Sequence, residues 1–182
     1  MESKSGYQYL LSYQYSSLIC DFTFDFCRIF LPGRELLRQR DQMTQAARSG
    51  KQNIVEGYSL ESLENYIKFL GIAKGSLKEL LEDYYDYLRQ HHLPILAKDS
   101  PEMRNMREMR IIERQNIYFL PQFPHLPHNP QLAANLLIML IQRTTYLLDK
   151  QIDSLKTKFI QEGGFRENLF KQRQKYRLQN QN

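Results

Sequence analysis

The chain has 182 residues, of which 42% are hydrophobic, and its formal net charge is +5. This length and composition support one hydrophobic core and require no second domain. Polar residues interrupt the apolar positions near the N-terminus, which argues against a signal peptide and against a membrane span.

The two cysteines indicate the redox compartment of the protein, and the charged residues are unevenly distributed along the chain. Cys20 and Cys27 lie two turns apart in a helical pattern, about 10 Å along a straight helix and too far for a disulfide. We therefore expect reduced thiols and a cytoplasmic protein. Residues 163–182 hold five bases and one acid, a net of +4, whereas residues 61–92 have a net of −2. Most of the net charge therefore lies in the C-terminal tail.

The first two predicted helices span residues 7–31 and 34–57 and are separated by Pro32 and Gly33. The first has apolar residues on more than one side, so we expect it to contact both its own bundle and a second surface. Small residues in the second would let a facing backbone come close. Gly57 is expected to end this helix and Ser59 to cap the next one.

The third predicted helix, ending near residues 91–94, has the most regular pattern of the chain, with apolar residues at three-four spacing for about seven turns. Gly71 and Gly75 lie four residues apart within it. A glycine inside a helix costs about 0.5–1 kcal/mol relative to alanine. We expect the close approach of a neighbouring helix at these two glycines to offset that cost.

A long connection over residues 94–130 precedes the last long helix. Ser100 and Pro101 predict a short charged helix to about Asn116, and prolines at every third position from 121 to 130 then predict an extended strap over the bundle surface. Asn129 and Pro130 start the last helix, which is expected to end at residues 163–164. The tail beyond, 163–182, has a weak apolar stripe, and we expect it to become helical only on binding a partner.

The predicted fold class is therefore all-α: an antiparallel up-down four-helix bundle over residues 1–162, with the inserted 94–130 segment and a basic C-terminal tail. Within it, the segments ARSGKQNIVEGY and YIKFLGIAKGSLKEL carry a family resemblance. The chain resembles the small bacterial four-helix-bundle proteins encoded in intervening sequences of large-subunit ribosomal RNA genes, which are related to the accessory variability proteins of diversity-generating retroelements. The matching positions are Gln42, Ala46, Asn53, Ile54, Glu56, Gly57, Tyr66, Phe69, Leu70, Ala73, Gly75, Ser76 and Leu80.

This resemblance implies a homo-oligomer, commonly a pentameric ring, with no known active site. The retroelement relatives are basic and are similar to nucleic-acid chaperones that bind a reverse transcriptase and its RNA. The chain differs from the family pattern in its long third connection and its added tail.

Candidate catalytic and metal sites are weak. Asn53 and Glu56 are interpreted as structural groups that satisfy free backbone amides where the second and third helices meet, since a lone carboxylate lacks a catalytic partner. Asp21 and Asp25 share a helix face, but a di-iron bundle would need Glu-x-x-His pairs, which this sequence lacks. His125 and His128 are interpreted as exposed loop histidines. We predict no metal, no cofactor, no small-molecule substrate and no enzymatic activity.

Binding is the better prediction. The first hypothesis is a homo-oligomeric scaffold for nucleic acid or a nucleoprotein such as a reverse transcriptase with its RNA. The alternative is a protein–protein assembly module that uses Phe24 on the first helix and the strap as interfaces. For the tail, a solvated end that only aids solubility also stays open. The predicted phosphate-binding residues are Arg166, Lys171, Arg173, Lys175 and Arg177 in the tail, and Arg34, Arg38 and Arg40 at the rim.

Overall fold

The computed structural model describes residues 5–108, 110–114, 117–119 and 122–179. This part of the chain is mostly helical, which confirms the predicted all-α class. Besides helices it contains one two-stranded antiparallel ribbon, in which Arg114 pairs with Ile117. The described elements are η1 (Gly6–Tyr9), α1 (Leu11–Phe30), η2 (Arg34–Leu36), α2 (Leu37–Tyr58), α3 (Leu63–Gln90), α4 (Pro101–Arg107), β1 (Ile112–Arg114), β2 (Ile117–Phe119), α5 (Pro130–Glu162) and α6 (Phe165–Gln179).

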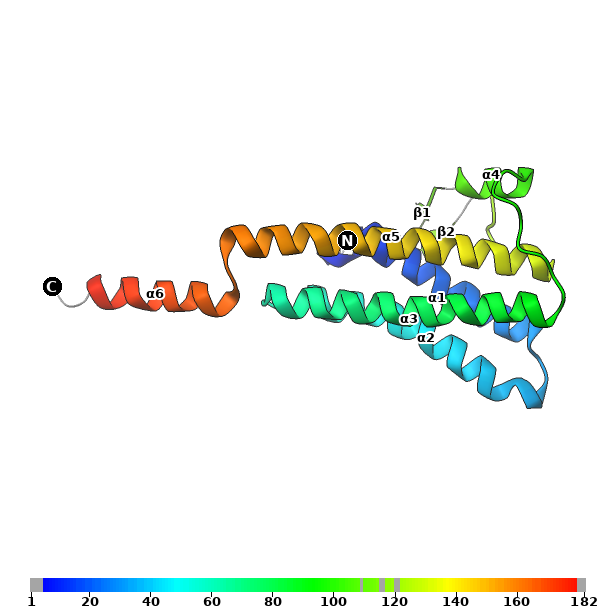
Figure 1. Cartoon of the computed structure of the whole chain (residues 1–182), viewed down its shortest axis with the longest axis horizontal. Helices are drawn as coiled ribbons and strands as arrows, with labels where there is room; N and C mark the ends of the chain where they lie inside the picture. Colours follow the sequence, from blue (N-terminus) through cyan, green and yellow to red (C-terminus); the bar gives the residue numbers. More distant parts are fainter. Residues whose placement is uncertain (1–4, 109, 115–116, 120–121, 180–182) are drawn as a thin grey trace.

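Four long helices, α1, α2, α3 and α5, lie side by side and run alternately in opposite directions (Figure 1). α2 contacts α3, α3 contacts α5, α5 contacts α1, and α1 contacts α2, so each of the four has two neighbours around one core. Each helix buries one stripe against the others at helical spacing. On α3 that stripe includes Leu70, Ala73, Leu77, Leu80 and Tyr84.

The first half of α5 is covered on all sides. Every residue from 133 to 141 is buried, as expected for a helix that is apolar all round. α1 and α3 cover its inner side, and α4 packs on its outer side (Figure 1). The fully buried Met106 of α4 and the buried Leu126 belong to this outer cover.

The 94–130 segment is tied to α5 at its start, where the backbone N–H of Leu96 donates to Oδ1 of Asn135 (2.9 Å). One part of the segment differs from its prediction. The helix predicted to reach about Asn116 ends at Arg107 instead, and β1 begins five residues later; Asn116 itself lies outside the described residues. The β-branched and aromatic residues of 111–119 favour extended backbone over helix.

The junction of α2 and α3 also differs from its prediction. Gly57 lies inside α2 and not at its end, and Ser59 is the C-terminal cap of α2. The N-terminal cap of α3 is Ser62, whose Oγ accepts from the backbone N–H of Asn65 (3.3 Å). The two helices are therefore joined by a turn of four residues.

The prediction for Gly71 and Gly75 is wrong. A Cβ built on either glycine would meet no other atom within 4 Å, and both residues are exposed. At 100° per residue the two glycines fall opposite the buried stripe of α3. The close approach comes from α2: a Cβ on Gly50 would lie 2.8 Å from Cδ2 of Leu77, and one on Gly57 would lie 2.9 Å from Cβ of Phe69. The α2–α3 hairpin is close-packed, but at glycines of the other helix.

Candidate functional site

α6 leaves α5 at a junction of two glycines. α5 ends at Glu162, and Gly163 has a φ of 79°, a left-handed conformation that favours glycine. The backbone N–H of Gly164 donates to Oε2 of Glu167 (3.1 Å), so a side chain of the first turn satisfies an amide at the start of α6. The tail, which we expected to be helical only when bound, is thus helical from Phe165 to Gln179 in the chain alone.

The first turn of α6 lies beside the α2–α3 junction. Phe165 and Arg166 line a hollow together with Ser62 and Glu64. The Ser62 hydroxyl donates to Oε2 of Glu64 (2.7 Å). This hydrogen bond, then a backbone hydrogen bond, and after them the charge of Arg166 lower the pKa of the Glu64 carboxyl.

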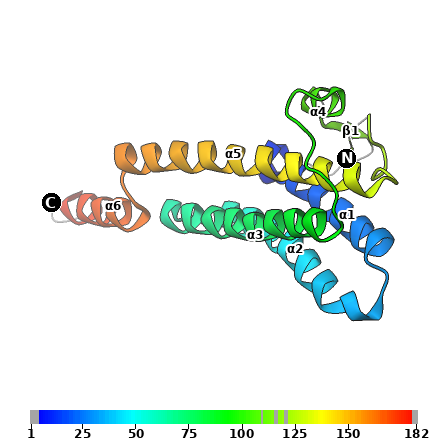
Figure 2. The ribbon, with the colours of Figure 1, turned by 45° about the vertical axis from the view of Figure 1, so that its right-hand side comes forward.

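Beyond this turn α6 extends away from the bundle along its long axis (Figures 1 and 2). None of its described residues is buried. At 100° per residue its bases follow two opposite edges of the helix. We call these the arginine edge (Arg166, Arg173 and Arg177) and the lysine edge (Lys171 and Lys175).

An apolar stripe adjoins the arginine edge. It consists of Phe165, Leu169 and Tyr176, which are 38%, 49% and 69% exposed. Phe170 and Leu178 are exposed as well, on other sides of the helix. α6 therefore presents both charge and apolar surface to its surroundings.

The predicted rim arginines lie at the other end of the bundle, near the start of α2 (Figures 1 and 2). Arg34 and Arg38 are exposed there. Arg40 has a structural role, because its Nη1 donates to the backbone oxygens of Leu31 (2.5 Å) and Gly33 (3.0 Å) and so holds the turn between α1 and α2. The structure thus separates the eight predicted bases into two distant groups and gives Arg40 a role inside the fold.

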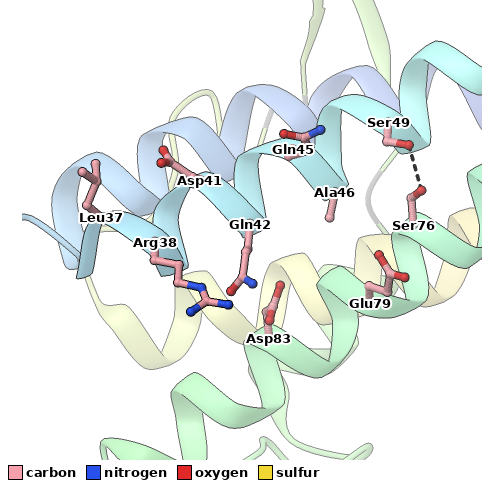
Figure 3. Close-up of a pocket in the computed structure, with 10 residues that line it drawn as sticks. All are labelled: Leu37, Arg38, Asp41, Gln42, Gln45, Ala46, Ser49, Ser76, Glu79 and Asp83. Carbon is pink, nitrogen blue, oxygen red and sulfur yellow. Dashed lines mark hydrogen bonds between the residues drawn. The ribbon is translucent and has the colours of Figure 1, made fainter. Parts of the chain in front are cut away.

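A groove of about 710 Å³ opens between α2 and α3. The two helices are joined at Ser49 and Ser76, whose hydroxyl groups are hydrogen-bonded (2.9 Å), and they separate toward the start of α2 (Figure 3). Arg38 points from α2 toward α3, while Glu79 and Asp83 point from α3 toward α2 (Figure 3). We call this space the α2–α3 groove.

The α2–α3 groove is acidic. Asp41, Glu79 and Asp83 line it together with a single base, Arg38. Burial, followed by the nearby charges of Asp86 and Glu79, raises the pKa of the Asp83 carboxyl. Asp41 was not singled out from the sequence, and the acids of α3 were counted only in the net charge of residues 61–92. Their spacing at 79, 82, 83 and 86, which clusters carboxylates on adjoining turns of one helix, was the signal that could have located them.

Asn53 and Glu56 do not satisfy the free amides of the helix junction as expected. Nδ2 of Asn53 donates to the backbone oxygen (2.9 Å) and to Oγ (3.1 Å) of Ser49, within α2. Glu56 is exposed and lines a shallow hollow shared with Phe24. Neither residue reaches the junction, which lies beyond them: Asn53 is half-buried and bonded within α2, and Glu56 is exposed.

The remaining candidates form no ligand set. In the ranges that the structure describes, no three His, Cys, Asp or Glu side chains gather closely enough to hold a metal ion. Oδ1 of Asp25 accepts from Nη2 of Arg28 (2.8 Å) and not from a group shared with Asp21. His125 and His128 are exposed, and Cys20 and Cys27 are free and buried, as predicted for a reduced pair.

The regularities of α1, α2 and α3 agree with one known family. The family model of the 23S rRNA-intervening sequence protein matches residues 10–106, more than half of the chain. The chain belongs to this family. The match includes every residue that lines the α2–α3 groove, whereas α5 and α6 of this intervening sequence protein lie outside it.

Comparisons with curated proteins and with solved structures give no match. The relation of this intervening sequence protein to the accessory variability proteins of retroelements stays a prediction. No helix in the described ranges has the length and apolar character needed to cross a membrane.

Proposed function

We propose that this intervening sequence protein is a non-enzymatic, homo-oligomeric binding scaffold of the cytoplasm, built on the antiparallel four-helix bundle of α1, α2, α3 and α5. α6 is the observation that carries the proposal. Within fifteen residues it exposes five large apolar side chains: Phe165, Leu169, Phe170, Tyr176 and Leu178.

We expect a helix with so much exposed apolar surface to bind a partner. An isolated helix of about 15 residues is marginally stable in water, because most helical stability in proteins comes from packing of an apolar face. Covering apolar surface contributes about 25 cal/mol per Å². A partner that covers α6 would therefore stabilise both the helix and the assembly.

The thiols support a binding role and a reducing compartment. Burial raises the pKa of both Cys20 and Cys27, that of Cys27 to about 12, so at neutral pH neither forms the thiolate that acts as a nucleophile. Both are free.

The mass of the full-length protein in solution tests the scaffold. Light scattering over a range of concentrations is expected to give a multiple of the 21.8 kDa chain mass, five being the number that the family resemblance implies. A mass of one chain at every concentration would contradict the proposal. A Phe24→Glu variant tests whether this half-exposed side chain of α1 lies in the interface, since an unchanged mass would exclude it.

A second candidate function is binding of nucleic acid, or of a nucleoprotein such as a reverse transcriptase with its RNA. The net charge of +4 on α6 and the exposed ring of Tyr176 favour it, since phosphates attract bases and nucleobases stack on aromatic rings. Arg34 and Arg38 would add contacts only at the opposite end of the bundle.

Retention of single-stranded RNA and DNA at increasing salt tests this candidate. Affinity is expected to fall steeply with salt and to drop after removal of residues 163–182. The Arg34→Gln/Arg38→Gln variant is the control for charge at the other end. Absence of binding by the intact oligomer at low salt would exclude the candidate.

A further inference from the structure

α6 and the α2–α3 groove complement each other but lie at opposite ends of the same chain. α6 starts beside the α2–α3 junction and points away from the bundle, whereas the α2–α3 groove opens near the start of α2 (Figures 1 and 2). In this orientation α6 does not contact the groove of its own chain. We propose that α6 of one chain occupies the α2–α3 groove of a second copy, an inference that rests on the proposed homo-oligomer.

The dimensions of the two parts agree. α6 has fifteen residues, which corresponds to a helix of about 22 Å. The groove follows α2 from Leu37 to Ser49, a length of about 18 Å at 1.5 Å per residue. Its volume of about 710 Å³ accommodates side chains of an entering helix, and the half-exposed Leu37 provides apolar surface at its outer end.

The charges are opposite in sign. The groove presents three carboxylates and one guanidinium, and α6 presents five bases and one acid. The arginine edge adjoins the apolar stripe, so a helix that inserts this stripe brings its arginines against Asp41, Glu79 and Asp83. Arginine pairs with carboxylates through two parallel hydrogen bonds, which gives such a contact geometric specificity. The lysine edge then faces away from the groove.

A contact between two different surfaces joins subunits head to tail. Such contacts close into a ring when the rotation between neighbours fits and otherwise continue as a filament. Each subunit in the assembly would donate one α6 and accept another. The exchanged helix would neutralise the carboxylates of the groove and remove its own apolar stripe from water.

The composition of α6 favours a protein partner over nucleic acid. Phosphate contacts require only bases, and a nucleobase stacks on an aromatic ring. Leu169 of the apolar stripe does neither, yet it is 49% exposed. A protein groove makes use of Leu169, the two aromatic rings of the apolar stripe and the arginine edge together.

Two charge reversals of equal size on opposite edges of α6 test the inference. Arg173→Glu/Arg177→Glu reverses the arginine edge, and Lys171→Glu/Lys175→Glu is the matched control on the lysine edge. Mass by light scattering over a concentration series, on nuclease-treated full-length protein, is the measurement. We expect the arginine variant to need at least about tenfold more protein for half-assembly, equivalent to about 1.4 kcal/mol. The lysine variant should assemble within about twofold of the wild type.

A charge swap identifies the acceptor. Glu79→Arg/Asp83→Arg alone should weaken assembly as the arginine variant does, because it repels the wild-type helix. Combined with Arg173→Glu/Arg177→Glu in one chain, it should restore assembly, since the exchanged residues of α6 and of α3 again have opposite charges. Far-UV circular dichroism and thermal melts of each variant show that the bundle is folded, so a loss of mass is a loss of assembly.

The other outcomes separate this inference from the proposed function. If the wild type assembles and both edge variants assemble equally well, α6 lies outside the interface; the inference fails and the scaffold stands. If the wild type is a single chain at all concentrations, both fail. If assembly disappears on nuclease treatment and either edge reversal abolishes RNA retention, α6 binds nucleic acid and the inference is overturned.

Discussion

Gly57 of α2 lies against Phe69 of α3 so closely that a methyl group on Gly57 would come within 2.9 Å of the Phe69 Cβ. The same methyl would also lie 3.3 Å from the backbone oxygen of Tyr66. Neither atom can rotate away, because both are fixed to the backbone of α3. Gly57→Ala is therefore expected to destabilise the fold by about 1–3 kcal/mol, the usual range for overpacking. Urea unfolding followed by circular dichroism measures the change.

The exposed glycines of α3 are the controls for this substitution. A methyl group on Gly71 or Gly75 meets open space, so each alanine variant should gain helix propensity without a clash. We expect an increase in the free energy of unfolding of up to about 1 kcal/mol for each. A loss of stability at either position would show that a second chain approaches α3 there.

The two pairs of glycines show what the sequence could and could not predict. Its periodicity placed Gly50, Gly71 and Gly75 inside helices and Gly57 at a helix end. The same periodicity puts Gly71 and Gly75 about opposite the stripe of Leu70, Leu77 and Tyr84. An angular count would thus have predicted their exposure. Which faces of α2 and α3 meet depends on how the bundle closes, and only the structure shows Gly50 against Leu77.

The candidate site was also predictable only in part, because some of its features are local in the sequence and others depend on tertiary packing. Five bases in the tail are evident from the sequence, and so is the break at Gly163. The α2–α3 groove is not, because it requires α2 to diverge from α3 beyond Ser49, a tertiary feature without a local signal (Figure 3). The structural role of Arg40 also depends on the path of the chain around Leu31 and Gly33.

Arg40 and Arg38 should therefore respond differently to the same substitution. Arg40→Gln removes a charged donor from two backbone oxygens of the α1–α2 turn, and hydrogen bonds of a charged group contribute about 1.5–3 kcal/mol. Arg38→Gln changes an exposed side chain and should alter the free energy of unfolding by less than about 0.5 kcal/mol. Chemical denaturation of the two variants side by side checks this. Equal losses would contradict the role given to Arg40.

A hydrogen bond inside the core joins α1 to α3. The hydroxyl of Tyr84 donates to Oγ1 of Thr23 (2.9 Å), and both residues are fully buried. Thr23→Val leaves the phenol hydroxyl without its acceptor and is expected to cost about 1–3 kcal/mol. Adding Tyr84→Phe should recover part of that loss, because removing both polar groups leaves neither unpaired. A double-mutant cycle by urea unfolding measures the interaction; strictly additive losses would contradict it.

The last prediction concerns alkaline pH. Burial is the main cause that raises the pKa of the Cys27 thiol to about 12, while the same thiol in the unfolded chain ionises near its ordinary value of 9.0. Below that value both states hold the proton and this group leaves stability unchanged. As pH rises from about 9 toward 12, only the unfolded chain releases the proton. The free energy of unfolding should therefore fall, by at most about 1.4 kcal/mol per pH unit for this one group.

Urea unfolding at pH 8, 9 and 10 measures the decline, and Cys27→Ser is the matched variant because its hydroxyl does not ionise in this range. The variant should be less stable at pH 8, since it places a polar group in the core, but its stability should fall less between pH 9 and pH 10. Tyr66, whose pKa burial also raises to about 12, ionises in the unfolded chain only near pH 10 and contributes mainly above this window. Equal slopes for the wild type and Cys27→Ser would show that the Cys27 thiol is not shielded from water in the folded protein.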